Sequence, residues 1–188
     1  MSFSCGQDKS EIVGETEWQK KMNADFKDAS KSPLKKKDLK EFKTLDFFNF
    51  DSTFVVQASL KRTPDSEWFD MPTTTERLTK ERIYGVLTFK ISNNEYSLNV
   101  FQGQRLMNTK GFRDYLFLPF LDDTNGDSTY GGGRYIELRI PKDDTIEIDF
   151  NKAYNPYCAY NEKYSCPIVP RENYLPLKVE AGVKAFVK

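Results

Sequence analysis

Residues 83–101 read IYGVLTFKISNNEYSLNVF, and this stretch decides the fold. Apolar side chains recur with a period of two on both sides of Ser92-Asn93-Asn94. Before this segment, one face of the strand carries Ile83, Leu87, Phe89 and Ile91. After it, Tyr96, Leu98 and Val100 alternate with Ser97, Asn99 and Phe101. This period predicts two antiparallel strands. Asn-Asn tolerates the positive φ that a tight turn requires, so we expect a hairpin.

Similar patterns predict further strands along the chain. They lie at residues 53–60, at 115–120, and in a second hairpin that pairs 136–140 with 146–150. Pro119 cannot donate a ladder hydrogen bond, which places strand 115–120 at a sheet edge or a strand end. The last residues, 175–188, can supply one or two short strands. We expect a mainly β fold, an antiparallel sandwich or partly closed barrel with N-terminal helices.

The segment before the strands is helical and rich in lysine. Trp18, Met22 and Phe26 are spaced four residues apart, which predicts a helix with Thr16 as its N-cap. A second short helix or turn follows Pro33. Its surroundings carry a basic cluster: Lys31, Lys35, Lys36, Lys37, Lys40 and Lys43. This cluster is either a solvated face or a surface attracted to anionic lipid headgroups.

The composition limits the possible partners. Lys+Arg and Asp+Glu number 28 each among 188 residues, so the formal net charge is +0. Nucleic-acid binding favours a basic excess, and we expect no nucleic-acid partner. The 14% aromatic content predicts an ordered, Phe-rich core. No apolar run approaches the roughly 20 residues that cross a bilayer.

The chain contains no histidine, which excludes several chemistries. Ser-His-Asp and Cys-His relays need an imidazole, and the His-based zinc, copper and non-haem iron sites are excluded with them. Three cysteines cannot complete an all-thiolate tetrahedral zinc site. Any catalysis would rely on carboxylates, Lys, Tyr, Cys or a bound cofactor, and the sequence predicts no particular cofactor or metal.

The sequence around Cys5 bears on the cellular location of the protein. Cys5 follows small residues and precedes a polar stretch, as at the processing site of a bacterial lipoprotein. The apolar segment that precedes such a site is missing, so we expect a shortened precursor in which Cys5 carries a lipid and residues 1–14 are a flexible tether to the cell envelope. The alternative is an ordinary cytoplasmic N-terminus. Residues 15–188 are expected to form a single domain.

Cys158 and Cys166 are separated by seven residues in a Pro-flanked loop. A disulfide could close this loop and would contribute about 2–3 kcal/mol on the chain-entropy model. The alternatives are a buried thiol pair, a reactive cysteine or a metal ligand. The spacing is a weak metal signal, because structural zinc sites favour shorter intervals.

Arg134 is the candidate for anion binding. It follows three glycines, Gly131–Gly133, and has the parity of the apolar strand residues after it, so its guanidinium points toward the core. A buried charge must be paired or face a wet cavity. One interpretation is an ion pair with an acidic residue: Asp122, Asp127, Asp149 or Glu172. The other is an anion site at the mouth of a β cavity.

Polar side chains crowd the segment after the second predicted hairpin, and they are Asp149, Asn151, Tyr154, Asn155 and Tyr160. Tyr and Asn supply both donors and acceptors. This density predicts either a polar pocket beside Arg134 or a hydrogen-bonded loop that pins the end of the strand.

Several strings resemble the bacterial and archaeal family catalogued as domain of unknown function 1684 (DUF1684). They are LFLPF at 116–120, TYGGGRY at 129–135, DFNKAYNP at 149–156, CAY at 158–160 and CP at 166–167, with SPL at 32–34, RIYG at 82–85, EN at 172–173 and AG at 181–182. The resemblance covers roughly residues 15–188. Tyr157 and Val183 depart from the family pattern. The resemblance supports the fold and the domain extent but implies no mechanism.

Two functional hypotheses follow. The first is a noncatalytic binding or scaffold domain, tethered through Cys5, whose polar pocket holds a small anionic ligand. The second is an enzyme whose pocket joins Arg134, Asp149 and Tyr154, with Cys158 as the nucleophile. The lack of any catalytic relay favours the first.

Overall fold

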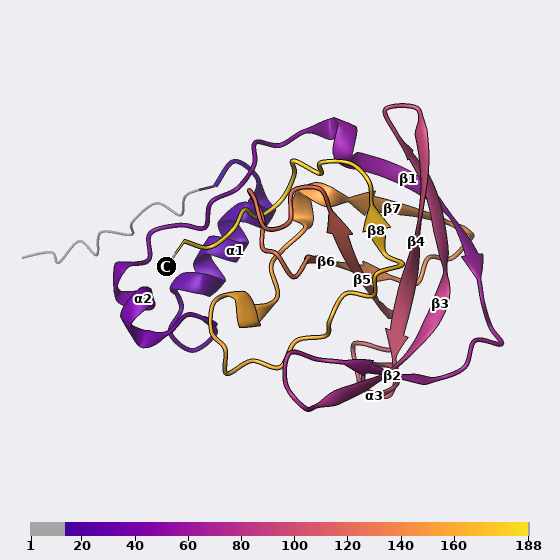
Figure 1. Cartoon of the computed structure of the whole chain (residues 1–188), viewed down its shortest axis with the longest axis horizontal. Helices are drawn as coiled ribbons and strands as arrows, with labels where there is room; N and C mark the ends of the chain where they lie inside the picture. Colours follow the sequence, from indigo (N-terminus) through magenta and orange to yellow (C-terminus); the bar gives the residue numbers. More distant parts are fainter. Residues whose placement is uncertain (1–13, 188) are drawn as a thin grey trace, which may run out of the picture.

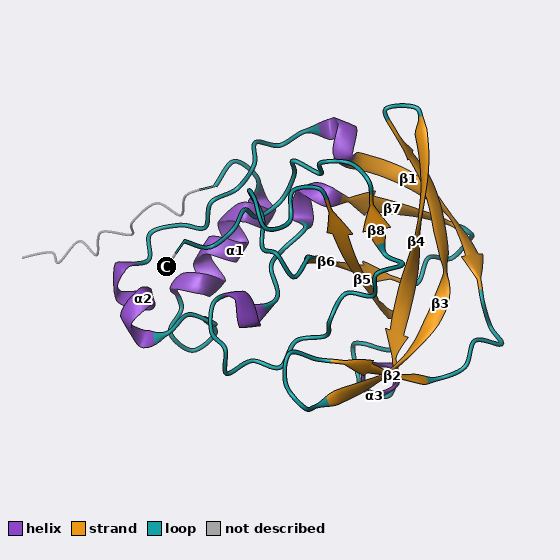
Figure 2. Ribbon diagram, viewed as in Figure 1, coloured by secondary structure: helices purple, strands orange, loops and turns teal. Residues whose placement is uncertain are grey.

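The computed structural model describes residues 14–187 and is built around one curled, mainly antiparallel sheet, in which only β8 pairs in parallel, with β5 (Figure 1). The order of its strands is β6-β5-β4-β3-β1-β7, with β2 paired to β3 and β8 paired to β5. The N-terminal helices and long loops lie at the other end of the molecule from the β3–β4 hairpin (Figure 2). The expected mainly β, partly closed architecture with N-terminal helices is confirmed as a half-barrel. Cys5 and the predicted tether up to residue 13 lie outside the described residues.

The elements have the following bounds. The helices are α1 (Glu17–Lys27), α2 (Lys36–Glu41) and α3 (Gln104–Met107). The strands are β1 (Val55–Arg62), β2 (Phe69–Pro72), β3 (Leu78–Ile91), β4 (Asn94–Gly103), β5 (Tyr115–Asp122), β6 (Arg134–Arg139), β7 (Thr145–Asp149) and β8 (Tyr174–Leu175). Helix α1 begins as predicted, because Thr16 accepts a hydrogen bond from the Gln19 amide at 3.2 Å.

The predicted hairpin is β3 and β4, which pair from Ile91–Asn94 back to Glu81–Gly103. Its turn places positive φ at Ser92 (48°) and Asn93 (68°), one residue earlier than the Asn-Asn pair. A bulge shifts the register between Ile83 and Gly85, and each extra residue moves the following side chains to the opposite face. Ile83 therefore packs with Phe101 on the outer face and does not share the face of Leu87, as the simple alternation predicted.

The second predicted hairpin is wrong. Strands β6 and β7 do not pair with each other; β6 pairs with β5 at one edge of the sheet, and β7 pairs with β1 at the other. Only residues 140–144 separate the two strands, and a chain of that length spans no more than about 20 Å. The short connection therefore requires the sheet to curl until its edges approach.

The prediction that Pro119 places strand 115–120 at a sheet edge or marks a strand end is also wrong, because β5 lies between β6 and β4 and continues past Pro119 to Asp122. Its pairing with β4 is confined to Phe117 and Phe101. Beyond that point the side chain of Asn173 fills the gap: its Nδ2 donates to the Pro119 carbonyl at 2.7 Å and to the Asn99 carbonyl at 2.7 Å. Its Oδ1 accepts from the Asn99 amide at 2.9 Å. The buried amide replaces the ladder bond that proline cannot supply.

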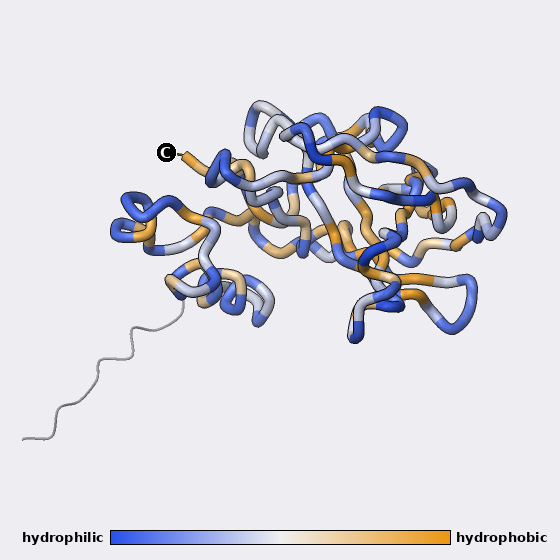
Figure 3. Tube along the Cα trace, turned by 90° about the horizontal axis from the view of Figure 1, so that it is seen from below, coloured by the Kyte–Doolittle hydropathy of each residue, from blue (hydrophilic) through white to orange (hydrophobic). Residues whose placement is uncertain are grey.

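The core has three parts. The largest fills the concave side of the sheet and includes side chains from both edge strands, such as Ile136 of β6 and Ile148 of β7. A second cluster joins α1 to Tyr160 and Val183. The third lies on the outer side of β5 and β6. Hydrophilic stretches mark the outer loops and turns in Figure 3. No helix within residues 14–187 is long and apolar enough to cross a membrane.

Of the three consecutive glycines, Gly133 alone has positive φ (+85°), and a Cβ there would lie 2.6 Å from the Phe120 carbonyl oxygen. We expect Gly133→Ala to lower the free energy of unfolding by about 1–3 kcal/mol, because both strain and contact oppose the methyl group. Gly131→Ala is the matched control, since its nearest neighbour lies at 3.7 Å, and should cost about 0.5 kcal/mol or less. Urea unfolding measures both, and equal effects would contradict this account.

Candidate functional site

Arg134 is fully buried at the start of β6, and its side chain is held by protein groups on several sides. Its Nη2 donates to Asp122 Oδ1 at 3.2 Å and to the Val179 carbonyl at 2.8 Å, while Nη1 donates to the Ala181 carbonyl. The guanidinium also lies over the Phe120 ring, 5.3 Å from its centroid. Burial lowers the pKa of Arg134, and the charge of Asp122 opposes this shift.

Asp122 completes the network. Its Oδ2 accepts hydrogen bonds from the Thr124 amide and hydroxyl and from the Val179 amide at 2.9 Å, and its Oδ1 also accepts from Asn125 at 3.0 Å. A buried pair offsets its desolvation cost only when its remaining hydrogen-bonding groups are largely satisfied in this way. Of the side-chain polar atoms of this pair, Arg134 Nε alone has no partner within the described residues. Arg134 lines none of the cavities found in the described residues. Of the two interpretations that the sequence left open for Arg134, the structure shows the ion pair, with Asp122 as its partner.

The other predicted polar residues mostly hold the loop after β7. Asp149 accepts from the Asn151 amide at 3.1 Å and pairs with Lys152 at 3.1 Å. Asn151 exchanges hydrogen bonds with the backbone of Asp51, at 2.9 and 3.0 Å. Asn155 donates to the Lys184 carbonyl at 2.8 Å, and to the hydroxyl of Tyr160, which is fully buried. These residues therefore stabilise the loop after β7 and make no hydrogen bond or ion pair with Arg134.

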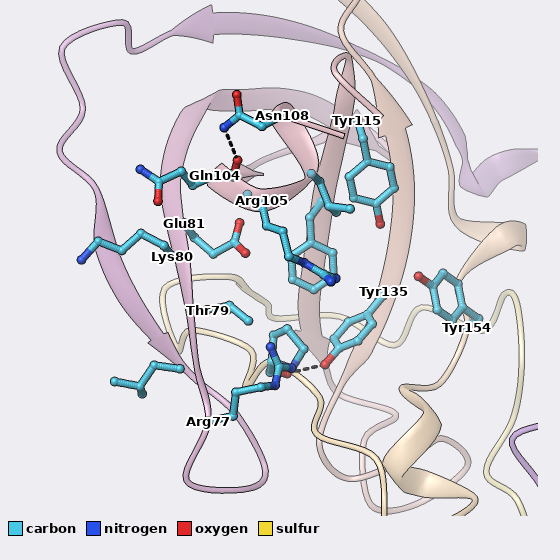
Figure 4. Close-up of a pocket in the computed structure, with 15 residues that line it drawn as sticks. Arg77, Thr79, Lys80, Glu81, Gln104, Arg105, Asn108, Tyr115, Tyr135 and Tyr154 are labelled. Carbon is cyan, nitrogen blue, oxygen red and sulfur yellow. Dashed lines mark hydrogen bonds between the residues drawn. The ribbon is translucent and has the colours of Figure 1, made fainter. Parts of the chain in front are cut away.

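Tyr154 alone among the predicted ligand-binding residues lines a cavity of substantial size. This cavity, here called the tyrosine pocket, measures about 520 Å³, within the range of small-molecule sites (Figure 4). It lies on the outer face of the sheet, where β3, the end of β4, α3, β5 and β6 meet the loops around Tyr154 and Pro167. Its principal lining side chains are Arg77, Glu81, Arg105, Tyr115, Phe117, Tyr135 and Tyr154.

Aromatic rings form one wall of the tyrosine pocket. Tyr135 packs edge-on against Phe117, with ring centroids 4.7 Å apart, and against Tyr154 at 5.9 Å. The Tyr135 hydroxyl donates to the Pro167 carbonyl, and the Tyr154 hydroxyl donates to Glu137 Oε1 at 3.1 Å. Burial raises the pKa values of both tyrosines, and that of Tyr115, well above their usual value. These side chains are therefore uncharged at neutral pH and offer neutral, partly apolar surface.

The opposite side of the pocket carries charge. Arg105 projects from α3 into the opening, and Glu81 projects from β3 (Figure 4). Arg77 lies at the rim, where its Nε and Nη2 donate to Ser165 at 2.9 and 2.7 Å. For Arg105, no side-chain hydrogen bond or ion pair is found within residues 14–187. The pocket therefore presents a guanidinium without a protein partner beside an aromatic wall.

Two smaller hollows adjoin the tyrosine pocket. One, of about 290 Å³, shares Tyr135, Tyr154 and Pro167 with it. The other, of about 430 Å³, shares Tyr154 and reaches α1 at Trp18. Tyr154 thus stands in the wall of all three cavities. Sequence analysis missed Glu81 and Arg105, because the predicted strand began at Ile83 and residues 104–107 show no helical pattern.

Cys158 and Cys166 lie together as free thiols. The Cys158 amide donates to Cys166 Sγ at 3.2 Å, and the Tyr130 hydroxyl lies 3.9 Å from Cys158 Sγ. A hydrogen bond from the Cys166 side chain, with smaller contributions from Thr74 and Tyr130, lowers the pKa of Cys158 to about 6 against the effect of burial. The same contact raises the pKa of Cys166. Joining of the pair in a disulfide stays a prediction.

No group of three or more His, Cys, Asp or Glu side chains in the described part of the chain is arranged to hold a metal ion. The enzyme hypothesis combined Arg134, Asp149, Tyr154 and Cys158. None of the hydrogen bonds and ion pairs given above connects any of these four residues to another.

Comparison with known proteins supports the fold but names no activity. The family model described as "Protein of unknown function (DUF1684)" matches residues 40–184. The solution NMR structure of an uncharacterised protein of Haloarcula marismortui is similar at 31% sequence identity and a TM-score of 0.67, covering 89% of this chain and 94% of that chain. No curated protein matches.

The buried pair can be tested against an exposed pair on the same strand. Arg134→Met leaves the Asp122 charge buried without its partner, and we expect it to lower the free energy of unfolding by about 3–5 kcal/mol. Arg139→Met removes the exposed pair with Asp114 at 2.8 Å, the hydrogen bond to the Gly111 carbonyl and contacts with the Phe112 and Tyr115 rings, and should cost about 1–2 kcal/mol. Urea denaturation gives both values, and similar costs would show that Arg134 is not held as described.

The thiol pair predicts a pH profile. In a Cys5→Ser background, alkylation of Cys158 should have its midpoint near the pKa of about 6, because the thiolate is the reacting form. Cys166→Ala removes the main stabilising hydrogen bond, and the midpoint should then move toward about 8.5, the usual value of a free cysteine. The rate of iodoacetamide labelling measures this shift. A midpoint that Cys166→Ala leaves in place would refute the proposed cause, and resistance to labelling until reduction would indicate a disulfide.

Proposed function

The chain belongs to the DUF1684 family, whose description assigns no activity, and we propose that this protein is a noncatalytic binding domain that holds a small anionic ligand in the tyrosine pocket. The observation that supports this proposal is the Arg105 guanidinium at a cavity of about 520 Å³. Guanidinium groups suit carboxylate and phosphate oxygens because their donors form a planar fork. The anionic ligand predicted from Arg134 is thus proposed at a different arginine.

The charge around the pocket supports an anionic ligand. Arg77, Lys80 and Arg105 all line it, against the single carboxyl of Glu81. Arg77 donates to Ser165, and Lys80 forms an exposed ion pair with Asp70 at 3.1 Å that offsets much of its charge. Arg105 is therefore the residue proposed to contact the anion directly.

The aromatic wall supports a ligand with an apolar part. Tyr115, Phe117 and Tyr135 give the pocket an uncharged surface, and small-molecule sites combine such surfaces with a few polar groups that fix orientation. The hydroxyls of Tyr135 and Tyr154 are already bonded to protein groups. Their rings are consequently held in place before a ligand arrives, which lowers the entropy cost of binding.

The alternative function is an enzyme with Cys158 as nucleophile, and its lowered pKa is the observation that favours it. A nucleophile also needs a general base and a group that stabilises developing charge within contact distance. Arg134, which the enzyme hypothesis placed in the same pocket as Cys158, is enclosed by Asp122 and the backbone of Val179 and Ala181. The binding function is therefore preferred.

Attachment to the cell envelope is proposed separately, through a lipid on Cys5. This residue lies outside the described part of the chain, so the proposal rests on the sequence around it. The basic cluster around α2 supports it, because exposed lysines add attraction to anionic headgroups: Lys36, Lys37, Lys40 and Lys43 are exposed or partly exposed.

The binding function predicts a ligand-dependent stabilisation that needs Arg105. In a thermal-shift screen of carboxylates and phosphates, we expect at least one anion to raise the Tm of the wild type, because a ligand at a hundred times its Kd adds about 2.7 kcal/mol. Arg105→Gln should abolish most of this rise. Arg171→Gln, an exposed arginine outside the cavities, should keep it. The proposal fails if no anion stabilises the wild type, or if both variants respond equally.

A further inference from the structure

Glu81 is a buried carboxyl that faces the tyrosine pocket. It is 8% exposed, and its Oε2 has no hydrogen-bond partner within the described residues. Burying such an oxygen without a partner costs free energy, and native structures rarely leave one unexplained. Figure 4 shows the carboxyl group directed from β3 into the space in front of Arg105 and the tyrosine wall.

The backbone opposite Glu81 is shaped to admit this carboxyl. Glu81 pairs with Gly103, the last residue of β4, and a Cβ at Gly103 would lie 3.0 Å from both carboxyl oxygens. A side chain at position 103 would therefore press on the carboxyl and require it to shift by a few tenths of an ångström. Gly103 also precedes α3, so the same turn that admits Glu81 sets the start of the helix that carries Arg105.

The protein groups around Glu81 do not fully balance the negative charge of its ionised carboxyl group. Burial raises the pKa of Glu81 to about 7, and a hydrogen bond from Thr79 and the charge of Arg77 only partly oppose this. Among the other charged groups of the adjoining elements, Lys80 pairs with Asp70 on β2, and Arg82 donates to Gln102. A protonated donor from outside the protein would satisfy the free oxygen.

We propose that the ligand of the tyrosine pocket is a small zwitterion of the α-amino-acid type with an apolar or aromatic side chain. Its ammonium group donates to Glu81 Oε2, its carboxylate binds Arg105, and its side chain packs against Tyr115, Phe117 and Tyr135. This inference rests on the proposed binding function and adds to it the second charged group of the ligand.

A zwitterion fits this pocket better than a simple anion does. Where Glu81 is ionised, above its pKa of about 7, its carboxylate reduces the attraction of the basic lining residues for an anion at Arg105, whereas a ligand ammonium beside Glu81 would be attracted to it. Hydrogen bonds between charged groups are also stronger than neutral ones. Glu81 lies on β3 opposite Gly103, and Arg105 lies on α3, which begins directly after Gly103, so the two charged side chains face the pocket from adjacent elements.

Three probes that differ by one charged group test this inference. L-phenylalanine carries both groups, hydrocinnamate lacks the ammonium, and phenethylamine lacks the carboxylate. Isothermal calorimetry at about pH 8, where the Glu81 carboxyl is mostly ionised, should give the wild type at least about tenfold tighter binding of L-phenylalanine than of either analogue.

Two variants test which side chain recognises each charged group of L-phenylalanine. Glu81→Gln should bind L-phenylalanine and hydrocinnamate with similar affinity, and Arg105→Gln should bind L-phenylalanine and phenethylamine with similar affinity. Glu172→Gln, an exposed glutamate away from the cavities, should keep the wild-type preference. The thermal unfolding of each variant, without ligand, shows whether it is folded.

The outcomes separate the two proposals. If hydrocinnamate binds the wild type as tightly as L-phenylalanine, the zwitterion inference is overturned and the anion site stands. If phenethylamine binds as tightly as L-phenylalanine, both are overturned. If no probe binds at millimolar concentration, the zwitterion inference is overturned, and the screen of carboxylates and phosphates decides the binding function. A preference that survives in Glu81→Gln would also overturn the assigned role of Glu81.

Discussion

The buried pair of Arg134 and Asp122 is the constraint on which the rest of the structure depends. It joins β5 to β6 and holds the C-terminal segment at Val179 and Ala181 against both. A charge enclosed this completely is stable only if its partners keep their positions, since removing one partner leaves the other buried and unpaired. Because neighbouring residues of a strand point to opposite faces, fixing Arg134 inward also fixes Tyr135 outward. The interior pair thereby positions the aromatic wall of the tyrosine pocket.

Local patterns predicted the elements better than their pairing. The β3–β4 hairpin and the capped helix α1 follow from residues close together in the chain. The pairing of β6 and β7 was wrong because strand periodicity does not say which strand is the neighbour, and the curl of the sheet lets a short connection link its two edges. The interior position of β5 depends on Asn173, which lies far along the chain and substitutes for the bond that Pro119 cannot make. Neither effect has a local sequence signal.

The candidate site shows the same limit. Strand alternation correctly predicted that the Arg134 side chain points toward the core. Alternation does not show whether a buried charge pairs with a carboxylate or faces a cavity. The cavity lies on the other face, where Tyr135 and Glu137 alternate with the core residues of β6. It exists because the loops around Tyr154 and Pro167 cover an outer face that sheets often expose to water. Tyr154 entered the prediction through local polar density, whereas Glu81 and Arg105 required the register of Glu81 with Gly103 to be known.

The two buried carboxyl groups of the described residues, Asp122 and Glu81, differ in how their oxygens are satisfied. Asp122 is surrounded by donors from Thr124, Val179 and Arg134, so its burial is balanced within the protein. Glu81 is nearly as buried, yet it keeps an oxygen without a partner in the described residues and faces open volume. Proteins tolerate such local conflicts mainly where binding or chemistry requires them, because a better-satisfied side chain would be more stable. The Glu81 carboxyl is therefore an observation that supports the proposed ligand site in the tyrosine pocket, while Asp122 belongs to the ion pair that joins β5 to β6.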